Sequence, residues 1–308
     1  MDKLTKVIKK TALLSLLGLV IVSCKEEKKA NGKLNVVTTT TMITDLVKNI
    51  GDTLVNVEGL MGSGVDPHLY KASEGDVSKL VNADIIFYNG LHLEGKLVEV
   101  FEKMKNKKTV AVSSVLDKNT LIGSDYFASN YDPHIWFNVD YWKQITQHVV
   151  TTLSEASPEQ KETFITNGKA YLQKLDVLSK EINASISTLP KEDRILVTAH
   201  DAFNYFGKSF DFEVVGLQGL STATEAGVQD VQKLATFIIE KKVKAIFVES
   251  SVPKRTIEAL QAAVKSKDHE VTIGGTLYSD ALGDAGTVEG TYIGMYKYNV
   301  NTIVNALK

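Results

Sequence analysis

The sequence predicts an α/β protein made of two lobes of parallel-type sheet covered by helices, joined by one long rigid helix. The length of 308 residues exceeds the roughly 100 to 200 residues of a usual domain. Beyond Gly32, short β-rich runs alternate with helical segments, which is the pattern of a parallel sheet with helices on its faces. A long helical segment interrupts this alternation, which begins again after Pro190. Each lobe is therefore expected to be Rossmann-like.

Residues 34–156 are predicted to form the N-terminal lobe. Its expected strands are the β-rich runs Leu34–Thr38, Val55–Leu60, Ile85–Tyr88 and Val110–Val112. Helices are expected near Met42–Ile50, Gly75–Val81, Leu97–Lys105 and Asp140–Leu153.

Residues 157–190 are predicted to form the connecting helix. Ser157 and Pro158 are typical of a helix start, with serine as N-cap and proline at the first helical position. Apolar residues then recur at helical spacing, and nothing stops the pattern before Pro190: Phe164, Tyr171, Leu175, Leu178 and Ile182. Because flexible linkers usually carry Gly or Ser, this connection disfavours large hinge motion.

Residues 191–308 are predicted to form the C-terminal lobe. Its expected strands are Ile195–Thr198, Glu213–Val215, Ala245–Val248 and Val271–Ile273. Helices are expected near Val228–Lys241 and Lys254–Val264, and Thr291–Leu307 is expected to close the chain as a helix despite its β-branched residues.

The N-terminus predicts a signal peptide over residues 1–23. Four lysines precede an apolar run, residues 11–23, that is shorter than the ~18 to 20 residues needed to span a bilayer. Ile21-Val22-Ser23-Cys24 resembles a bacterial lipobox, which implies lipid on the Cys24 sulfur, cleavage before it and a polar tether over residues 24–33. The alternative is an ordinary secretory signal with an incidental thiol.

Charge and cysteine content exclude several classes of protein. Lys and Arg number 35 against 37 Asp and Glu, so the chain lacks the basic excess that binding to nucleic acid requires. With one cysteine, no internal disulfide or multi-thiolate metal site can form.

Four residues stand out where ligands bind in α/β sheets, beyond the carboxyl ends of strands. His68 follows the strand that ends near Leu60, His200 directly follows Thr198-Ala199, and Asp280 lies just beyond the last strand. His134 is less clearly placed, but Asp132-Pro133-His134 repeats the Asp66-Pro67-His68 tripeptide.

Three imidazoles and a carboxylate are enough for a closed four-coordinate site on a divalent metal. The competing interpretation is that each histidine is a turn or core residue. Two observations favour the metal site. Each lobe offers two such residues, and the recurring tripeptide contains a proline that restricts the backbone beside the histidine.

Other titratable residues are not predicted to bind the metal directly. Glu249 ends a strand, where its carboxylate could fix the tautomer of a ligating imidazole, and Asp66 and Asp132 could do the same. His92 is expected to start a helix and to act in capping or domain packing. His148 and His269 are expected at the surface.

Enzymatic motifs are missing from the sequence. It contains no His-Glu-x-x-His, Gly-x-Ser-x-Gly or phosphate-loop pattern. A catalytic zinc generally keeps one position open for water, which four protein ligands would fill. Binding without turnover is therefore expected.

Several motifs together resemble the solute-binding lipoproteins of zinc and manganese ABC importers, the TroA-like metal receptors. The resemblance runs from about Leu34 to Leu307 through Asp66-Pro67-His68, Leu93-Glu94-Gly95, Asp132-Pro133-His134-Ile135-Trp136, Ala199-His200-Asp201-Ala202-Phe203, Phe247-Val248-Glu249 and Leu277-Tyr278-Ser279-Asp280. It implies a metal held in the cleft between two lobes by His68, His134, His200 and Asp280. It also implies an extracytoplasmic, lipid-anchored protein, in the periplasm or at the cell surface, that delivers metal to a permease with its ATPase. We expect a monomer.

The identity of the metal stays open. Imidazole-rich sites favour zinc, because Mn²⁺ lies at the weak end of the affinity order and prefers oxygen. The chain lacks the His-rich acidic loop of many zinc-dedicated members, and residues 90–96 are more similar to the mixed manganese and zinc branch. Iron also remains open. The alternatives to metal delivery are a surface adhesin or metal-stabilised lipoprotein and a zinc hydrolase.

Overall fold

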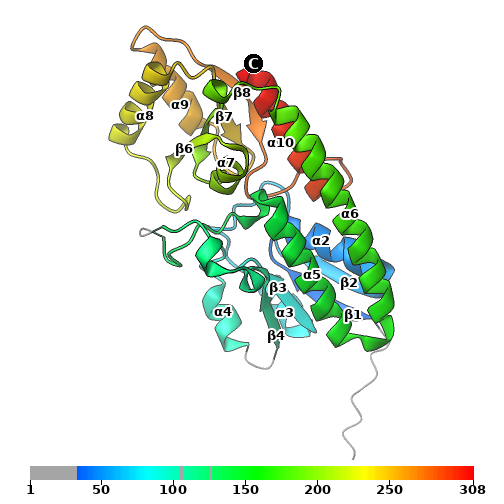
Figure 1. Ribbon diagram of the computed structural model, residues 1–308. Coiled ribbons are helices and arrows are strands. Elements are labelled where there is room, and N and C mark those ends of the chain that lie inside the picture. The colour runs from blue at the N-terminus through cyan, green and yellow to red at the C-terminus, as the bar shows by residue number, and fades with distance from the viewer. Residues whose placement is uncertain (1–32, 105–106, 125–126) are drawn as a thin grey trace, which may run out of the picture. The chain divides into compact units, whose positions relative to one another are not determined.

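The computed structural model describes residues 33–104, 107–124 and 127–308, and Leu34–Lys308 forms one compact unit. Within it lie two four-stranded sheets, both entirely parallel (Figure 1). The predicted signal peptide, most of the predicted tether and Cys24 fall outside the described residues. No helix in the part of the chain that the structure describes has the length and apolar character needed to cross a bilayer.

The first sheet has the strand order β2-β1-β3-β4. Its strands are β1 (Leu34–Thr38), β2 (Val55–Gly59), β3 (Ile85–Tyr88) and β4 (Lys108–Ala111). The helices that follow these strands are α2 (Thr41–Gly51), α3 (Glu74–Asn82) and α4 (Val98–Lys103). We call this sheet, its helices and α5 (Val139–Ala156) the N-terminal lobe.

The second sheet repeats this arrangement in the order β6-β5-β7-β8 and forms the C-terminal lobe. Its strands are β5 (Ile195–His200), β6 (Glu213–Gln218), β7 (Ala245–Glu249) and β8 (Thr272–Leu277). Its helices are α7 (Asn204–Phe210), α8 (Val228–Lys241), α9 (Arg255–Lys265) and α10 (Tyr292–Leu307). In both sheets the first and third strands are neighbours, so the order reverses between them and creates a position where ligands bind in α/β folds.

Helix α6 (Lys161–Ile186) packs against elements of both lobes. Every residue of the predicted apolar stripe is buried along it. The Asn167 side chain donates to the carbonyl of Ile50 in α2, and Lys297 of α10 pairs with Glu181 of α6 at 2.6 Å. One hydrophobic cluster runs from β1 to the end of α10 and includes this stripe, so the connection between the lobes is a packed core.

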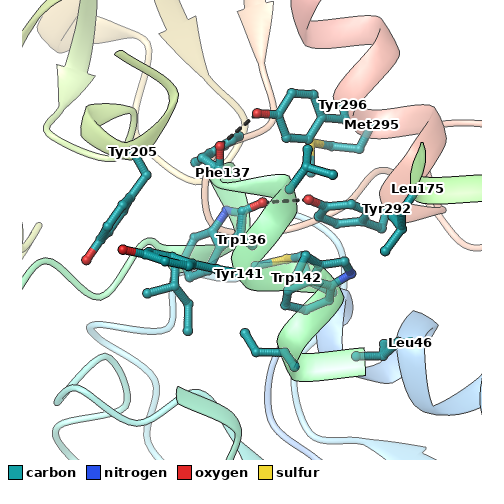
Figure 2. Close-up of a cluster of buried hydrophobic side chains, with 14 of the residues drawn as sticks. Leu46, Trp136, Phe137, Tyr141, Trp142, Leu175, Tyr205, Tyr292, Met295 and Tyr296 are labelled. Carbon is teal, nitrogen blue, oxygen red and sulfur yellow. Dashed lines mark hydrogen bonds between the residues drawn. The ribbon is translucent and has the colours of Figure 1, made fainter. Parts of the chain in front are cut away.

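Aromatic side chains make the centre of this shared core (Figure 2). Trp142 of α5 stacks on Tyr292 of α10, with ring centroids 4.8 Å apart. The hydroxyls of Tyr292 and Tyr296 donate to the carbonyls of Trp136 and Phe137, both at 2.7 Å. Each buried phenol thus finds an acceptor, and α10 of one lobe is tied to the segment before α5 in the other.

The predicted α/β class, the two parallel sheets and all eight strands are confirmed within a few residues. The connecting helix is shorter than predicted, since a 3-10 turn (Pro158–Gln160) precedes α6 and the helix ends at Ile186, before Pro190. Ser157 does not cap a helix but donates its hydroxyl to Glu159 at 2.5 Å. Helix α7 was not predicted. The domain boundaries at residues 156 and 190 stay a prediction.

Candidate metal centre

The four predicted ligands come from different kinds of segment. His68 lies in the loop between β2 and α3, and Asp280 lies in the loop between β8 and α10. His200 is the last residue of β5, which places it beside β7 where the order of the second sheet reverses. His134 does not follow a strand, because the turn Ile135–Phe137 and then α5 begin directly after it. Each lobe contributes two of the four residues.

The structure brings these four side chains together. Each offers one ligand atom, and those atoms all lie within 4.8 Å of one another. The Nε2 atoms of His68 and His134 are 3.3 Å apart, and the Asp280 carboxylate lies 3.3 Å from Nε2 of His200 and 3.6 Å from Nε2 of His134. Nε2 of His68 and Oδ2 of Asp280 are 4.0 Å apart.

Three of these four distances match the ligand separations around a tetrahedral metal ion. A tetrahedral ion with bonds of about 2.0 to 2.2 Å separates its ligand atoms by about 3.3 to 3.6 Å. Oδ1 of Asp280 faces His134 while Oδ2 faces His68 and His200. The carboxylate is therefore oriented to offer one oxygen or both to an ion.

Two carboxylates orient two of the three imidazoles through their Nδ1 atoms. Oε2 of Glu249 lies 2.6 Å from Nδ1 of His200, and its Oε1 accepts the backbone N–H of His200 at 2.8 Å. Oδ1 of Asp132 lies 2.7 Å from Nδ1 of His134 and accepts that residue's backbone N–H at 2.9 Å. Because each Nδ1 is engaged by a carboxylate, each Nε2 is left free to bind metal.

The two Asp-Pro-His tripeptides differ in this respect. Asp66 accepts the backbone N–H of His68 at 2.8 Å but does not reach its ring, so the expectation that it fixes the tautomer is wrong. Its other oxygen accepts the hydroxyl of Thr222 in the C-terminal lobe at 2.5 Å. Asp66 therefore links the two lobes beside His68.

Burial and charge set the protonation of the site. His68 is 6% exposed, the other three predicted ligands at most 1%, and burial lowers the pKa of His68 to about 3. Burial also disfavours a charge on His200, but the Glu249 and Asp280 carboxylates raise its pKa well above 6.5. Burial would raise the pKa of Asp280, yet the neighbouring imidazoles, His200 foremost, hold it below its usual value. The two carboxylates that flank His200 therefore favour the charged form of its imidazole.

Glu94 is a buried carboxylate to which the sequence analysis gave no role, although it lies in the Leu93-Glu94-Gly95 motif. It accepts the Thr39 hydroxyl at 2.6 Å and the Asn89 backbone N–H at 2.7 Å. The Asn89 side chain in turn donates to the carbonyl of Pro133 at 2.9 Å. Glu94 thus connects the ends of β1 and β3 to the peptide that precedes His134.

The remaining histidines do not join the cluster. His92 lies in a turn with a left-handed φ of 62° and not at a helix start, since α4 begins at Val98. His148 is partly covered, and its Nε2 has no hydrogen-bond partner among the described residues. His269 is also partly covered.

Comparisons with known proteins show the family to which the chain belongs. A family model described as ZnuA, zinc-uptake complex component A, periplasmic, matches residues 36–306. The manganese-binding lipoprotein MntA of Bacillus subtilis is 48% identical over 282 residues, 91% of this chain and 92% of that protein. The zinc-binding protein TroA of Treponema pallidum is 49% identical over 283 residues, 92% of this chain and 91% of its own length.

The structure of TroA from Treponema pallidum superimposes with a TM-score of 0.87 at 50% identity and covers 90% of this chain and 99% of that one. Matches of this identity and coverage show family membership as well as fold. The chain therefore belongs to the ZnuA family, the TroA-like solute-binding lipoproteins that its motifs resemble.

Proposed function

We propose that this protein captures one divalent transition-metal ion, Mn²⁺ or Zn²⁺, between its lobes and delivers it to an ABC importer. The observation that carries the proposal is the convergence of His68, His134, His200 and Asp280 in a buried position. Among the described residues, Oδ1 of Asp280 is buried with no hydrogen-bond partner. Since buried polar atoms are nearly always satisfied, this oxygen supports a ligand at this point.

Binding without catalysis is favoured by the same geometry. Four protein ligands fill a tetrahedral shell, so a tetrahedral ion held by all four would have no position left for an attacking water. A zinc hydrolase would need such a position and measurable turnover. We therefore propose that the protein is a receptor and not an enzyme.

The donor set supports both metals. Three imidazole nitrogens favour Zn²⁺, whereas a carboxylate that can offer two oxygens suits Mn²⁺. The relatives divide in the same way, because a manganese-binding and a zinc-binding protein are similar to this chain to nearly the same degree. Iron stays open.

Metal analysis followed by uptake assays tests the proposal. Protein purified without added metal should contain one Mn²⁺ or Zn²⁺ per chain, and a competition titration should rank the two ions. Cells that lack the protein should take up that metal more slowly, because its permease receives no loaded receptor. Normal uptake would favour the adhesin or metal-stabilised lipoprotein, and substoichiometric metal would reject the site.

The lipid anchor on Cys24 remains part of the proposal. The relatives that match most of this chain include proteins named as lipoproteins, and the Ile21–Cys24 sequence supports the same attachment here. We expect Cys24→Ser to abolish lipidation and processing, measured by metabolic labelling with a fatty acid and by the mass of the product. Continued labelling of the Cys24→Ser variant would show that the lipobox interpretation is wrong.

Apparent metal affinity is expected to fall as pH falls, because a proton on His200 competes with the metal. The raised pKa of His200 means that this competition begins above pH 6.5, whereas His68, with a pKa of about 3, is already neutral. One proton released from His200 changes the dissociation constant about tenfold per pH unit. Chelator competition between about pH 6 and pH 8 measures this slope, and an affinity independent of pH over that range would contradict it.

A further inference from the structure

The loop that carries Asp280 is held by the opposite lobe. Ser279 and Leu282, on either side of Asp280, each form a hydrogen bond to the N-terminal lobe. The indole N–H of Trp136 donates to the carbonyl of Ser279 at 2.9 Å, and the backbone N–H of Leu282 donates to Oγ1 of Thr41 at 2.8 Å. The peptide bond that begins with the Ser279 carbonyl leads directly into Asp280.

Trp136 is held in place by burial, by a hydrogen bond to its carbonyl and by a ring contact. It is fully buried, and its carbonyl accepts the Tyr292 hydroxyl at 2.7 Å (Figure 2). Its ring lies edge-on to the His134 imidazole, with ring centroids 5.3 Å apart. Because Trp136 lies two residues after His134, one short segment holds a nitrogen ligand and the backbone of the oxygen ligand together.

Within the C-terminal lobe, Asp280 has a different polar neighbour. The hydroxyl of Ser251 lies 3.4 Å from Oδ2 of Asp280 and 3.0 Å from Oγ of Ser279. If the Trp136 bond were lost, the buried Ser279 carbonyl would be left without its donor. The peptide that leads into Asp280 would then be free to rotate, and the Asp280 carboxylate would be less firmly held among the imidazoles.

We propose that Trp136 and Thr41 are positioning residues that hold Asp280 in place for metal, and that they thereby set the preference between Mn²⁺ and Zn²⁺. Asp280 supplies the only oxygen ligand among the four residues of the cluster. Mn²⁺ depends on oxygen ligands more than Zn²⁺ does, because imidazoles alone retain zinc. This inference rests on the proposed metal-binding function and assigns a determinant of selectivity within it.

Trp136→Phe tests the inference, because it keeps an aromatic ring and removes the N–H. Loss of supporting contacts around a ligand typically weakens metal binding about 10- to 100-fold. We expect a loss in that range for Mn²⁺ and a loss at least about fivefold smaller for Zn²⁺. The ratio of the two dissociation constants, from chelator competition, is the readout, because a loss of fold stability alone would not change it.

Trp142→Phe is the matched control. Trp142 is the other tryptophan of the chain, is equally buried in the same aromatic cluster, and directs its indole N–H to the Tyr171 hydroxyl at 3.4 Å and not to the Asp280 loop. Its Mn²⁺ to Zn²⁺ ratio should equal that of the wild type. Thr41→Val removes the hydroxyl that accepts the Leu282 N–H, at a partly exposed position. This variant should shift the Mn²⁺ to Zn²⁺ ratio in the same direction as Trp136→Phe. It therefore keeps the test decisive if Trp136→Phe fails to fold.

An unchanged ratio in Trp136→Phe, or in Thr41→Val if only that variant folds, would overturn the inference. An equal shift in Trp142→Phe would also overturn it, because general packing would then be the cause. A wild-type protein that binds neither ion at one per chain would instead refute the proposed function, so the two failures are distinguishable.

Discussion

Replacing His200 or Asp280 by Ala is expected to weaken binding of the metal by more than about 100-fold, since loss of a direct ligand should exceed the 10- to 100-fold effect of its supporting contacts. His200→Ala also leaves the Glu249 carboxylate, which is 2% exposed, without its imidazole partner. Asp280→Ala removes the negative charge that faces the ion. Calorimetric or chelator-competition titration of the purified variants gives the loss directly.

His148→Ala and His269→Ala are the controls for this experiment. Both residues are histidines that lie outside the four-residue cluster, so binding should match that of the wild type. Glu249→Gln should fall between the two groups, with a loss of about 10- to 100-fold, because the imidazole remains but its orienting carboxylate is gone. Equal losses in the controls and the ligand variants would reject the site assignment.

Metal is expected to raise the melting temperature by roughly 5 to 10 °C when free metal is about 100 times the dissociation constant. The ion binds the folded chain preferentially, so at this concentration it adds about 2.7 kcal/mol to the free energy of unfolding. Differential scanning calorimetry with and without metal at about pH 7.5 measures the shift at a pH where the imidazoles can release their protons.

The triple variant His68→Ala, His134→Ala, His200→Ala should lose this shift completely. Its melting temperature without metal serves as its own reference, so any change in the stability of the empty protein does not enter the comparison. A metal-dependent shift that survives in the triple variant would place the ion elsewhere, and a wild-type protein indifferent to metal would reject the site.

Much of the fold could be predicted because its signals are local. The alternation of β-branched runs with amphipathic segments predicts each strand, and the stripe from Phe164 to Ile182 predicts the long helix. Helix α7 has only seven residues, too few for a periodic pattern to emerge. The end of α6 at Ile186 depends on tertiary contacts, since Arg194 donates to the carbonyls of Ile186 and Leu189 and satisfies the helix end.

His68, His200 and Asp280 could be proposed from their positions after strands, and His134 from the repeated tripeptide. The structure brings all four side chains together. The contacts that support these ligands were harder to predict from the sequence. Asp66 and Asp132 occupy identical tripeptides, yet only Asp132 reaches its histidine ring, so the tripeptide alone does not determine this contact. The contact between Trp136 and Ser279 joins residues 143 positions apart, a separation that no local pattern reports.

Anomalous diffraction from crystals of the metal-loaded protein tests the central claim most directly. Data collected at the absorption edge of the bound metal locate that ion without reference to any assumed ligand. The account predicts one peak per chain, about 2.0 to 2.2 Å from Nε2 of His68, His134 and His200 and from a carboxylate oxygen of Asp280. A peak at any other position, or no peak in protein shown to contain metal, would contradict it.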